Sequence, residues 1–496
     1  MATGTSPASR FGELLGSHLR AKTPLLVIQT DEERRALERL QAAARESKRP
    51  FHLTLAESLG DQWEVALEGW SAQEPGAILV AVDLHHLVNE HRFVRGLRAL
   101  VSTLEERGQT LLFVSPSWST PRDLERDVVV LELPLPDAGS LRRLAAAEGQ
   151  HRSVTLSNEV LDGAVRALQG FTLHGAQRAL RRAFEVEPGL AQDSLTSLLE
   201  DKRTLLGQSE DLEMVDAPPS LDAVGGLDVL KRWLGERSQA FGERAARFGL
   251  PAPRGLLLVG VHGCGKSLTA KAVAHHWDLP LVRLEFGALF GGDGSPEAAL
   301  RRVQRITSAM APVVLWIDEI DKAFGALGPG EASERATVER LFASFVTWLQ
   351  ERQEPVFVVA TANAVDHLPP ELLRKGRFDE VFFVDLPSAR EREQILKVHL
   401  ERKERSPQGF DLQRLAAEAE FFTGAELEAV ITSGLFRAFR AGRELTTEDL
   451  QVAIEQTVPL YRMYEEPIKA LRAWAKTRAR RASTDLRLTE LWERQG

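Results

Sequence analysis

The chain has 496 residues, of which 43% are hydrophobic and 27% charged, and its formal net charge is −9. A chain of this length exceeds what one hydrophobic core usually serves, so two or three domains are expected. The acidic balance excludes a protein whose whole surface is a cationic coat for nucleic acid, and the single cysteine, Cys264, excludes an intramolecular disulfide.

The first half of the chain alternates apolar runs with helical patterns. An amphipathic helix is expected over 11–20, and an apolar run over 24–29 indicates a buried strand. Further strands are expected over 77–82, 110–115 and 128–133, with helices such as 92–107 between them. This alternation predicts a mostly parallel sheet with crossover helices. From residue 137 to about 202 only helical periodicity remains.

A segment rich in helix breakers separates the two halves. Residues 204–220 include Gly207, Pro218 and Pro219 and show no apolar periodicity, which predicts a linker. The second half then repeats the plan, with strands expected over 255–259, 281–284, 313–317, 356–361 and 381–384, and only helices after Pro387. We therefore expect an α/β protein with two tandem modules of related architecture. Each is a mostly parallel sheet with flanking helices, followed by a helical segment.

A glycine-rich motif stands between the strand expected over 255–259 and the helix that follows. Residues 260–267, GVHGCGKS, fit the pattern G-x-x-x-x-G-K-[ST]. Its glycines let successive backbone N–H groups turn towards phosphate oxygens, and the helix N-terminus adds the positive end of its dipole. Lys266 is expected to reach the β- and γ-phosphates, and the Ser267 hydroxyl to bind Mg²⁺. The expected nucleotide contacts are Gly260, Val261, His262, Gly263, Cys264, Gly265, Lys266, Ser267 and Leu268.

Two carboxylates follow the apolar run Pro312–Ile317. Asp318 is placed by this strand at its carboxyl end, where it is expected to bind Mg²⁺, and Glu319 is expected to polarise the attacking water. Asn363, after the apolar strand that begins at Val356, is a candidate hydrogen-bond donor to the γ-phosphate or the lytic water. The cationic loop that follows contains Arg374 and Arg377.

The order of phosphate loop, Asp-Glu strand, Thr-Ala-Asn and Arg-Lys-Gly-Arg-Phe-Asp resembles the AAA ATPase family. The likeness covers roughly 221–459 and extends to Val224-Gly225 as the adenine-side segment and to Gly424-Ala425 in the lid motif. It implies that Arg374 and Arg377 are arginine fingers that complete a neighbouring subunit's site, and therefore a ring, usually of six. A more specific likeness is to the divergent AAA proteins of red-algal plastids and cyanobacteria. The residues that carry it include the run 263–271 and the tail 471–475.

With this resemblance, five regions are expected along the chain. They are a degenerate AAA-like N-terminal domain without a phosphate loop (1–203), a linker (204–220), the large ATPase subdomain (221–387), a helical lid (388–458) and a basic helical tail (459–496).

The N-terminal half lacks the residues of a hydrolytic site. Its first strand is followed by Thr30-Asp31-Glu32-Glu33, which has no glycine and would repel a triphosphate, so no hydrolysis is expected there. Asp83, His85 and His86 include possible metal ligands, but adjacent histidines at a helix start point in different directions. The half is better interpreted as a substrate, adaptor or ring-stabilising domain.

The sequence leaves three features open. Residues 288–296, with Phe290, depart from the pore-loop pattern of threading motors, and the cationic residues of 469–481 indicate either a solvated or intersubunit helix face or a nucleic-acid patch. Cys264 is either a redox-sensitive thiol or a small packing residue.

The expected function is Mg²⁺-dependent ATP hydrolysis by a ring that remodels a protein partner. A nucleotide-gated regulatory scaffold and a nucleic-acid-associated ATPase are the alternatives. No membrane span is expected, because no apolar window reaches about 18 residues. The N-terminus lacks the pattern of a secretory signal, which predicts a cytoplasmic protein.

Overall fold

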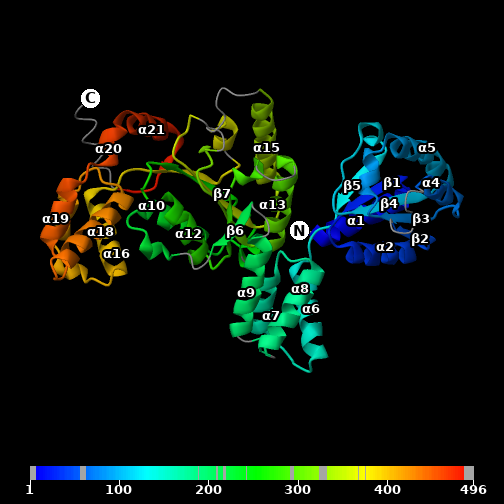
Figure 1. Ribbon diagram of the computed structural model, residues 1–496, viewed down its shortest axis with the longest axis horizontal. Coiled ribbons are helices and arrows are strands. Elements are labelled where there is room, and N and C mark those ends of the chain that lie inside the picture. Colours follow the sequence, from blue (N-terminus) through cyan, green and yellow to red (C-terminus); the bar gives the residue numbers. More distant parts are fainter. Residues whose placement is uncertain are drawn as a thin grey trace. The chain divides into compact units, whose positions relative to one another are not determined.

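The computed structural model describes residues 7–55, 63–187, 189–190, 192–207, 211–215, 219–241, 243–290, 295–322, 332–366, 368–374 and 376–484. The chain divides into two compact units, 1–202 and 203–496. Each unit contains a sheet with helices on both faces, followed by helices, so the expected α/β class with parallel sheets is confirmed (Figure 1).

The first unit is built on a five-stranded parallel sheet of order β2-β3-β4-β1-β5. The strands consist of β1 (Leu25–Gln29), β2 (Phe51–Leu55), β3 (Ile78–Val82), β4 (Thr110–Ser115) and β5 (Val128–Glu132). The helices around them are α1 (Pro7–Ala21), α2 (Glu33–Ser47), α4 (Trp63–Ala72) and α5 (His91–Arg107). One sheet face packs on α1 and α2 and the other on α4 and α5. The central strands can therefore be apolar on both sides, as their sequences are.

Four helices follow this sheet and share a core of their own. They are α6 (Ala138–His151), α7 (Asn158–Leu168), α8 (Leu173–Val186) and α9 (Gln192–Gly207). Side chains of Asp137, Ser157 and Thr172 accept hydrogen bonds from backbone N–H groups in the first turns of α6, α7 and α8, which fixes where these helices begin.

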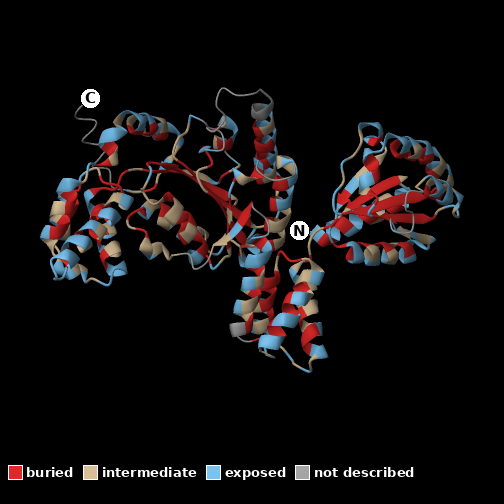
Figure 2. Ribbon diagram, in the orientation of Figure 1, coloured by how far each residue is buried: buried red, intermediate tan, exposed pale blue. Residues whose placement is uncertain are grey.

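The second unit contains a seven-stranded sheet of order β12-β11-β7-β10-β9-β8-β6. Its strands consist of β6 (Leu212–Val215), β7 (Gly255–Gly260), β8 (Leu281–Leu284), β9 (Val313–Ile317), β10 (Val356–Ala362), β11 (Glu380–Val384) and β12 (Arg480–Arg481). Helices α10 (Asp228–Arg237) and α12 (Lys266–His276) cover one face, and α13 (Pro296–Met310) and α15 (Ala332–Glu351) cover the other. A short helix, α11 (Glu243–Phe248), precedes β7. The central strands are buried from end to end (Figure 2).

The helices after β11 form a separate cluster and then return to the sheet. They are α16 (Ala389–Arg402), α17 (Leu412–Glu418), α18 (Gly424–Arg440), α19 (Thr447–Gln456), α20 (Leu460–Met463) and α21 (Glu465–Arg478). Helices α16 to α19 share one core, whereas Leu471 and Ala475 of α21 are buried in the core beside α13 and α15.

Two expectations about the chain's organisation need correction. The segment 204–220 is not only a linker, because it contains the end of α9 and β6, which pairs antiparallel with β8 at the sheet edge. The tail after 459 is not purely helical, because it contains β12, which pairs parallel to β11. Both strands are short, and their stability comes from the sheet edge they join. Strand β2 was also missed, since it lies at an edge and is only half-buried.

The two sheets share one topology. The first sheet has the spatial order β2-β3-β4-β1-β5. In the second sheet the five strands β7 to β11, taken as its first to fifth strands, have the matching order β8-β9-β10-β7-β11. In each, the first strand lies between the fourth and the fifth.

Candidate nucleotide-binding site

The glycine-rich motif forms the turn between β7 and α12. Gly263 and Gly265 have φ values of 76° and 90°, in the left-handed region that favours glycine. A Cβ on Gly260 would lie 1.9 Å from the carbonyl oxygen of Val384, so only glycine fits where the loop leaves the sheet. The loop therefore has the backbone freedom that lets N–H groups converge on phosphate oxygens.

Lys266 lies at the first residue of α12 and is 6% exposed. Its Nζ donates to the carbonyl oxygens of Gly260 and Val261, both at 2.8 Å. Burial lowers the pKa of Lys266 to about 8, because few groups replace the water around its charge. An anionic phosphate in the loop would stabilise the charged form further and raise this pKa.

Asp318 stands at the end of β9 and meets two hydroxyl groups. Its Oδ1 accepts hydrogen bonds from Ser267 Oγ at 2.8 Å and from Thr361 Oγ1 at 2.6 Å. The phosphate loop, β9 and β10 are thus joined at one carboxylate, because the carboxyl ends of neighbouring parallel strands meet at one edge of the sheet. Ser267 and Asp318, expected to bind the metal, are in direct contact.

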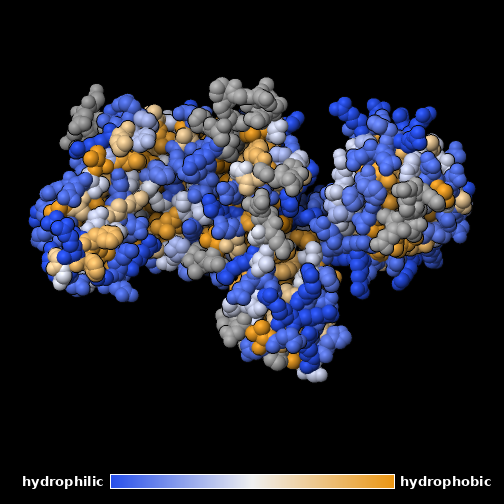
Figure 3. Space-filling model, in the orientation of Figure 1, coloured by the Kyte–Doolittle hydropathy of each residue, from blue (hydrophilic) through white to orange (hydrophobic). Residues whose placement is uncertain are grey.

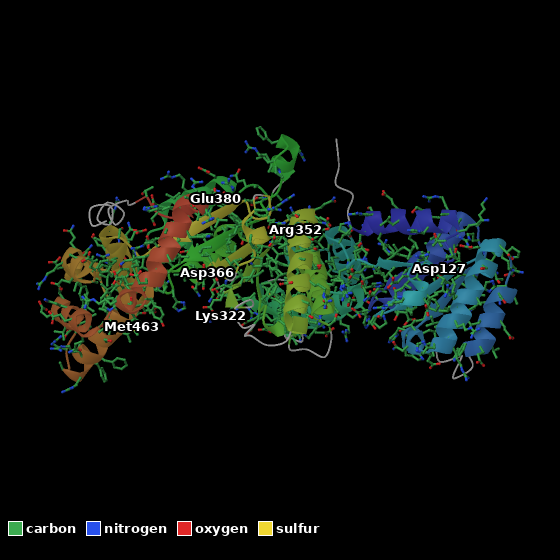
Figure 4. The ribbon with its side chains drawn as sticks, turned by 90° about the horizontal axis from the view of Figure 1, so that it is seen from above. Asp127, Lys322, Arg352, Asp366, Glu380 and Met463 are labelled. Atoms are coloured by element: carbon green, nitrogen blue, oxygen red, sulfur yellow. The ribbon has the colours of Figure 1, made fainter. Side chains whose placement is uncertain are left out.

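Both the backbone and the side chain of Glu319 are fixed by contacts with neighbouring residues. Its N–H donates to Thr361 Oγ1 at 2.9 Å, and its φ of 49° turns the chain sharply after the strand. Asn363 Nδ2 donates to Glu319 Oε1 at 2.9 Å, and Lys322 Nζ lies 2.5 Å from Oε2. Lys322 extends into solvent, with 70% of its side chain exposed (Figure 4). The carboxylate therefore lies beside the phosphate loop, 4.0 Å from His262 Nδ1, with fixed hydrogen-bond partners.

These residues line one pocket of about 350 Å³. From the expected set it contains Val224, Gly225, Glu319, Asn363, Gly424 and Ala425, together with residues 262–268. The described lining does not include Gly260, Val261 or Asp318. These residues instead accept hydrogen bonds from two residues that do line the pocket, Lys266 and Ser267.

The lid contributes a wall that sequence reasoning missed. Ala425 N donates to Gly263 O at 3.0 Å, so the start of α18 rests on the phosphate loop. The additional lining residues, all outside the expected set, are Ala223, Thr361, Ile395, Val398, His399, Arg402 and Glu428. The members on α16 are spaced by three or four residues, a pattern typical of any buried helix face, and this is why the sequence did not single them out.

His399 is the titratable group of this wall. Its side chain is 12% exposed, and its Nδ1 lies 3.8 Å from Glu428 Oε1. Burial lowers the pKa of His399, so its neutral form prevails at neutral pH even with a carboxylate nearby. A neutral imidazole and the apolar Ile395 and Val398 suit a flat heterocyclic base better than a phosphate.

Arg374 and Arg377 are not brought to this pocket. The short helix Pro370–Leu373 precedes them, and the described lining contains neither. Within the described part of the chain, Nε and Nη1 of Arg377 are buried and have no hydrogen-bond partner, whereas Arg374 is exposed. Their intervening neighbour, Lys375, lies outside the described residues.

Comparisons with known proteins agree with this geometry. The model of the ATPase family associated with various cellular activities (AAA) matches residues 256–386. Models of the N-terminal and second domains of SpoVK-like AAA ATPases match 11–133 and 138–209. The chain is 39% identical to the uncharacterized AAA domain-containing protein ycf46 of Pyropia yezoensis over 404 residues, 81% of this chain and 82% of that protein. The chain belongs to the AAA ATPase family, in the ycf46 group.

Other relatives of this AAA ATPase place it in the same family. The ycf46 protein of Trieres chinensis is 35% identical over 418 residues, 84% of each chain. The proteasome-activating nucleotidase of Methanosarcina mazei is 33% identical over 245 residues, 47% of this chain and 57% of that protein. The protein is therefore an ATPase that binds nucleotide, and the expected resemblance is confirmed.

The open features of this AAA ATPase are partly resolved. Burial raises the pKa of the Cys264 thiol to about 12, which favours packing over a reactive thiolate. In the described ranges, no cluster of three or more His, Cys, Asp or Glu side chains could hold a metal ion, so Asp83, His85 and His86 form no such site. Residues 291–294 of the pore-loop region lie outside the described residues.

Three of the six cationic residues in 469–481 pair with acidic side chains. Lys469 pairs with Glu465 and Glu466, and Arg472 pairs with Asp385. Arg480 Nη1 lies 3.7 Å from an oxygen of Glu380, which Figure 4 labels. Because these cationic groups already have acidic partners in their own chain, the pairs favour a structural helix face over a nucleic-acid patch.

No described helix is both long and apolar enough to cross a membrane. The visible surface is mainly hydrophilic, with scattered hydrophobic residues (Figure 3).

Proposed function

We propose that this AAA ATPase hydrolyses ATP at the pocket between the phosphate loop and the lid, and that a ring of subunits couples the cycle to remodelling of a protein partner. The observation that carries the proposal is the hydrogen-bonded series from Ser267 through Asp318, Thr361 and Glu319 to Asn363. This series joins the phosphate loop to a carboxylate that is oriented but still open to the pocket.

The roles follow from these contacts. Lys266 and the loop N–H groups bind the β- and γ-phosphates, and Glu319 accepts the proton of the attacking water. Asn363 donates to Glu319 Oε1 and so points the other carboxylate oxygen and the water towards the γ-phosphate. Positioning and charge stabilisation make up most of phosphoryl-transfer catalysis, so a fixed geometry of this kind suits it.

The residues present fit Mg²⁺. A serine hydroxyl and a carboxylate in contact at 2.8 Å are hard oxygen donors, which this ion prefers. Ser267 and Asp318 would hold it, and it would neutralise charge on the β- and γ-phosphates.

The ring is supported by the position of the arginine loop. Arg374 is exposed and Arg377 keeps two buried nitrogen atoms without a hydrogen-bond partner among the described residues, yet neither lines the pocket of its own chain. The exposed guanidinium of Arg374 is available to phosphates of an adjacent subunit, and Arg377 would have to turn outward to give its unpartnered nitrogen atoms an acceptor there. We assign both as arginine fingers acting between subunits.

We further propose that the first unit is a degenerate copy of the second. Its sheet has the same strand order and is likewise followed by four helices with their own core. Where a phosphate loop would follow β1, Glu32 pairs with Arg35 and accepts a hydrogen bond from Leu173 N. A buried carboxylate occupies that position, which supports a role in binding a substrate or adaptor rather than nucleotide.

The proposal that the protein remodels a protein partner is supported by the names of two relatives. One is named a proteasome-activating nucleotidase, and another an ATP-dependent zinc metalloprotease FtsH 2, from Petrotoga mobilis, 33% identical over 246 residues. A remodelling enzyme accelerates its ATPase when its substrate is added, whereas the turnover of a regulatory scaffold stays slow. Steady-state turnover with and without proteins captured from the native host decides between the two.

The ring is tested by mixing two inactive variants. Arg377→Ala should bind ATP but not hydrolyse it, and Glu319→Gln should do the same. Mixed rings regain activity at Arg377→Ala sites that receive Arg377 from a Glu319→Gln neighbour. Arg390→Ala, an exposed arginine at the start of α16, is the matched control and should hydrolyse normally. An inactive mixture, or normal turnover by Arg377→Ala alone, would overturn the assignment.

A further inference from the structure

The C-terminal end of the described chain passes from one face of the second sheet to the other. Leu471 and Ala475 of α21 are buried beside α13 and α15, whereas Ala482 is buried beside α10 and α12. Between them β12 pairs with β11, with Arg480 opposite Phe382 (Figure 1, red). Residues 480–484, the C-terminal strap, therefore wrap around this edge of the sheet.

The strap provides the N-terminal cap of helix α10. Leu227, at the N-cap position, has a φ of 55° and offers no side-chain cap. The carbonyl oxygen of Ala482 instead accepts from Val229 N at 3.0 Å and Leu230 N at 3.1 Å. These are two of the donors that every helix start leaves without a partner in the helix. Ala482 of the strap thus caps the N-terminus of α10, as the side chain of a serine or aspartate at the N-cap position usually does.

A second attachment uses Thr484. Its N–H and its hydroxyl donate to the two carboxylate oxygens of Asp228, at 2.9 and 2.6 Å. Asp228 is the first residue of α10 and lies three positions after Gly225, which lines the nucleotide pocket. The strap therefore fixes the segment that carries one wall of the pocket.

A single carboxylate of the lid joins the strap to that wall. Glu391 Oε1 accepts from Leu227 N at 3.1 Å and from the Ser483 hydroxyl, while Oε2 accepts from Ser388 N at 3.0 Å. The next turn of α16 adds Gln394, whose Oε1 accepts from Gly226 N at 3.0 Å. Three segments distant in sequence meet at Glu391: the adenine-side segment, the start of α16 and the strap.

The residues at this junction are so closely packed that neither Gly225 nor Gly226 has room for a side chain. A Cβ on Gly226 would lie 2.3 Å from Glu391 Oε1, and one on Gly225 would lie 2.5 Å from Cγ1 of Ile395. Gly225 and Ile395 pack against each other, and both line the nucleotide pocket. A shift of α16 relative to the adenine-side segment therefore changes the shape of the pocket where these two residues line it.

We propose that the C-terminal strap is part of the nucleotide site: through Ser483 and Glu391 it holds the Val224–Gly225 wall against lid helix α16 and so sets nucleotide affinity. Ser483 and Thr484 are positioning residues and touch no reacting group. This inference rests on the proposed function, because it concerns the same pocket. Within the described residues, the hydrogen bonds of Lys266, Asp318, Glu319 and Asn363 involve no residue of the strap, so the hydrolytic step keeps its geometry when the strap is lost.

The test compares two chains that both lack residues 485–496. One ends at Thr484 and keeps every strap contact, and the other ends at Ala479. The dissociation constant of a fluorescent ADP analogue is measured for each, with the KM and kcat of ATP hydrolysis. We expect the chain ending at Thr484 to match the full chain. The shorter chain should bind at least about tenfold more weakly, with a raised KM and an unchanged kcat, because several hydrogen bonds are lost, three of them to the carboxylates of Asp228 and Glu391.

Point variants keep the test decisive if the shorter chain fails to fold. Ser483→Ala should weaken binding by about three- to tenfold, the loss of one charge-assisted hydrogen bond, and Ser483→Thr, which keeps the hydroxyl, should restore it. Thr477→Ala, on the exposed side of α21, is the control. If Ser483→Ala binds the ADP analogue as tightly as the full chain does, the proposed role of the strap in nucleotide affinity is wrong, whereas the proposed ATPase site is unaffected. A full chain that binds no nucleotide would contradict the proposed function itself.

Discussion

Thr361 is the residue on which the geometry of the two carboxylates depends. It is 1% exposed, donates to Asp318 Oδ1 at 2.6 Å and accepts from Glu319 N at 2.9 Å. Thr361→Val keeps the shape of the side chain but removes its hydroxyl. The N–H of Glu319 is then left without its acceptor, and Asp318 keeps only Ser267 among these hydroxyl partners.

These contacts determine how much stability and activity Thr361→Val should lose. A buried polar group left without a partner costs about 1–3 kcal/mol, so the free energy of unfolding should fall by about 2 kcal/mol. Turnover should fall at least about tenfold, since about 1.4 kcal/mol of lost transition-state stabilisation suffices for that. Nucleotide affinity should change little, because Lys266 and the phosphate loop keep their contacts.

Urea unfolding followed by tryptophan fluorescence, with steady-state ATPase rates, measures both effects. Thr361→Ser is the matched control, because it keeps the hydroxyl and loses only a methyl group. A Thr361→Val variant as stable and as active as Thr361→Ser would show that the hydroxyl does not hold the two carboxylates in place.

Two further predictions concern the loop and the lid. Lys266→Ala should abolish binding of a fluorescent ADP analogue without lowering the melting temperature, because within the described residues the lysine donates only to two carbonyl oxygens of its own loop. Unchanged binding would show that Lys266 is not part of the site. In the lid, the hydrogen bond from Arg443 and those from Thr446 lower the pKa of Asp449 to about 2. A depressed carboxylate pKa stabilises the fold above the unfolded value and is lost as pH falls through the folded one. The melting-temperature gap between wild type and Asp449→Asn should therefore be constant above about pH 5 and narrow towards pH 3; a gap independent of pH would contradict the pairing.

The phosphate loop and the two carboxylates could be predicted because their geometry is local. Residues 260–267 form one continuous turn, and Asp318 and Asn363 follow buried strands whose ends must meet at one edge of a parallel sheet. Sequence spacing alone is enough for such features.

Features that depend on distant partners could not be predicted. Thr361 resembles any β-branched strand residue until Asp318 and the Glu319 N–H are placed beside it. Strands β6 and β12 have two to four residues and exist because a sheet edge accepts them, so 204–220 was interpreted as a linker only. The role of Glu391 requires three segments to meet, which no local pattern encodes.

Hydrolysis at this pocket by Glu319 is tested most directly by single-turnover hydrolysis of radiolabelled ATP by Glu319→Gln. The amide keeps an oxygen to accept from Asn363 Nδ2 but cannot take the proton of water. ATP affinity should be equal to or tighter than that of wild type, and hydrolysis should be slowed by about 10²- to 10⁴-fold. Hydrolysis within a few-fold of the wild-type rate would contradict it.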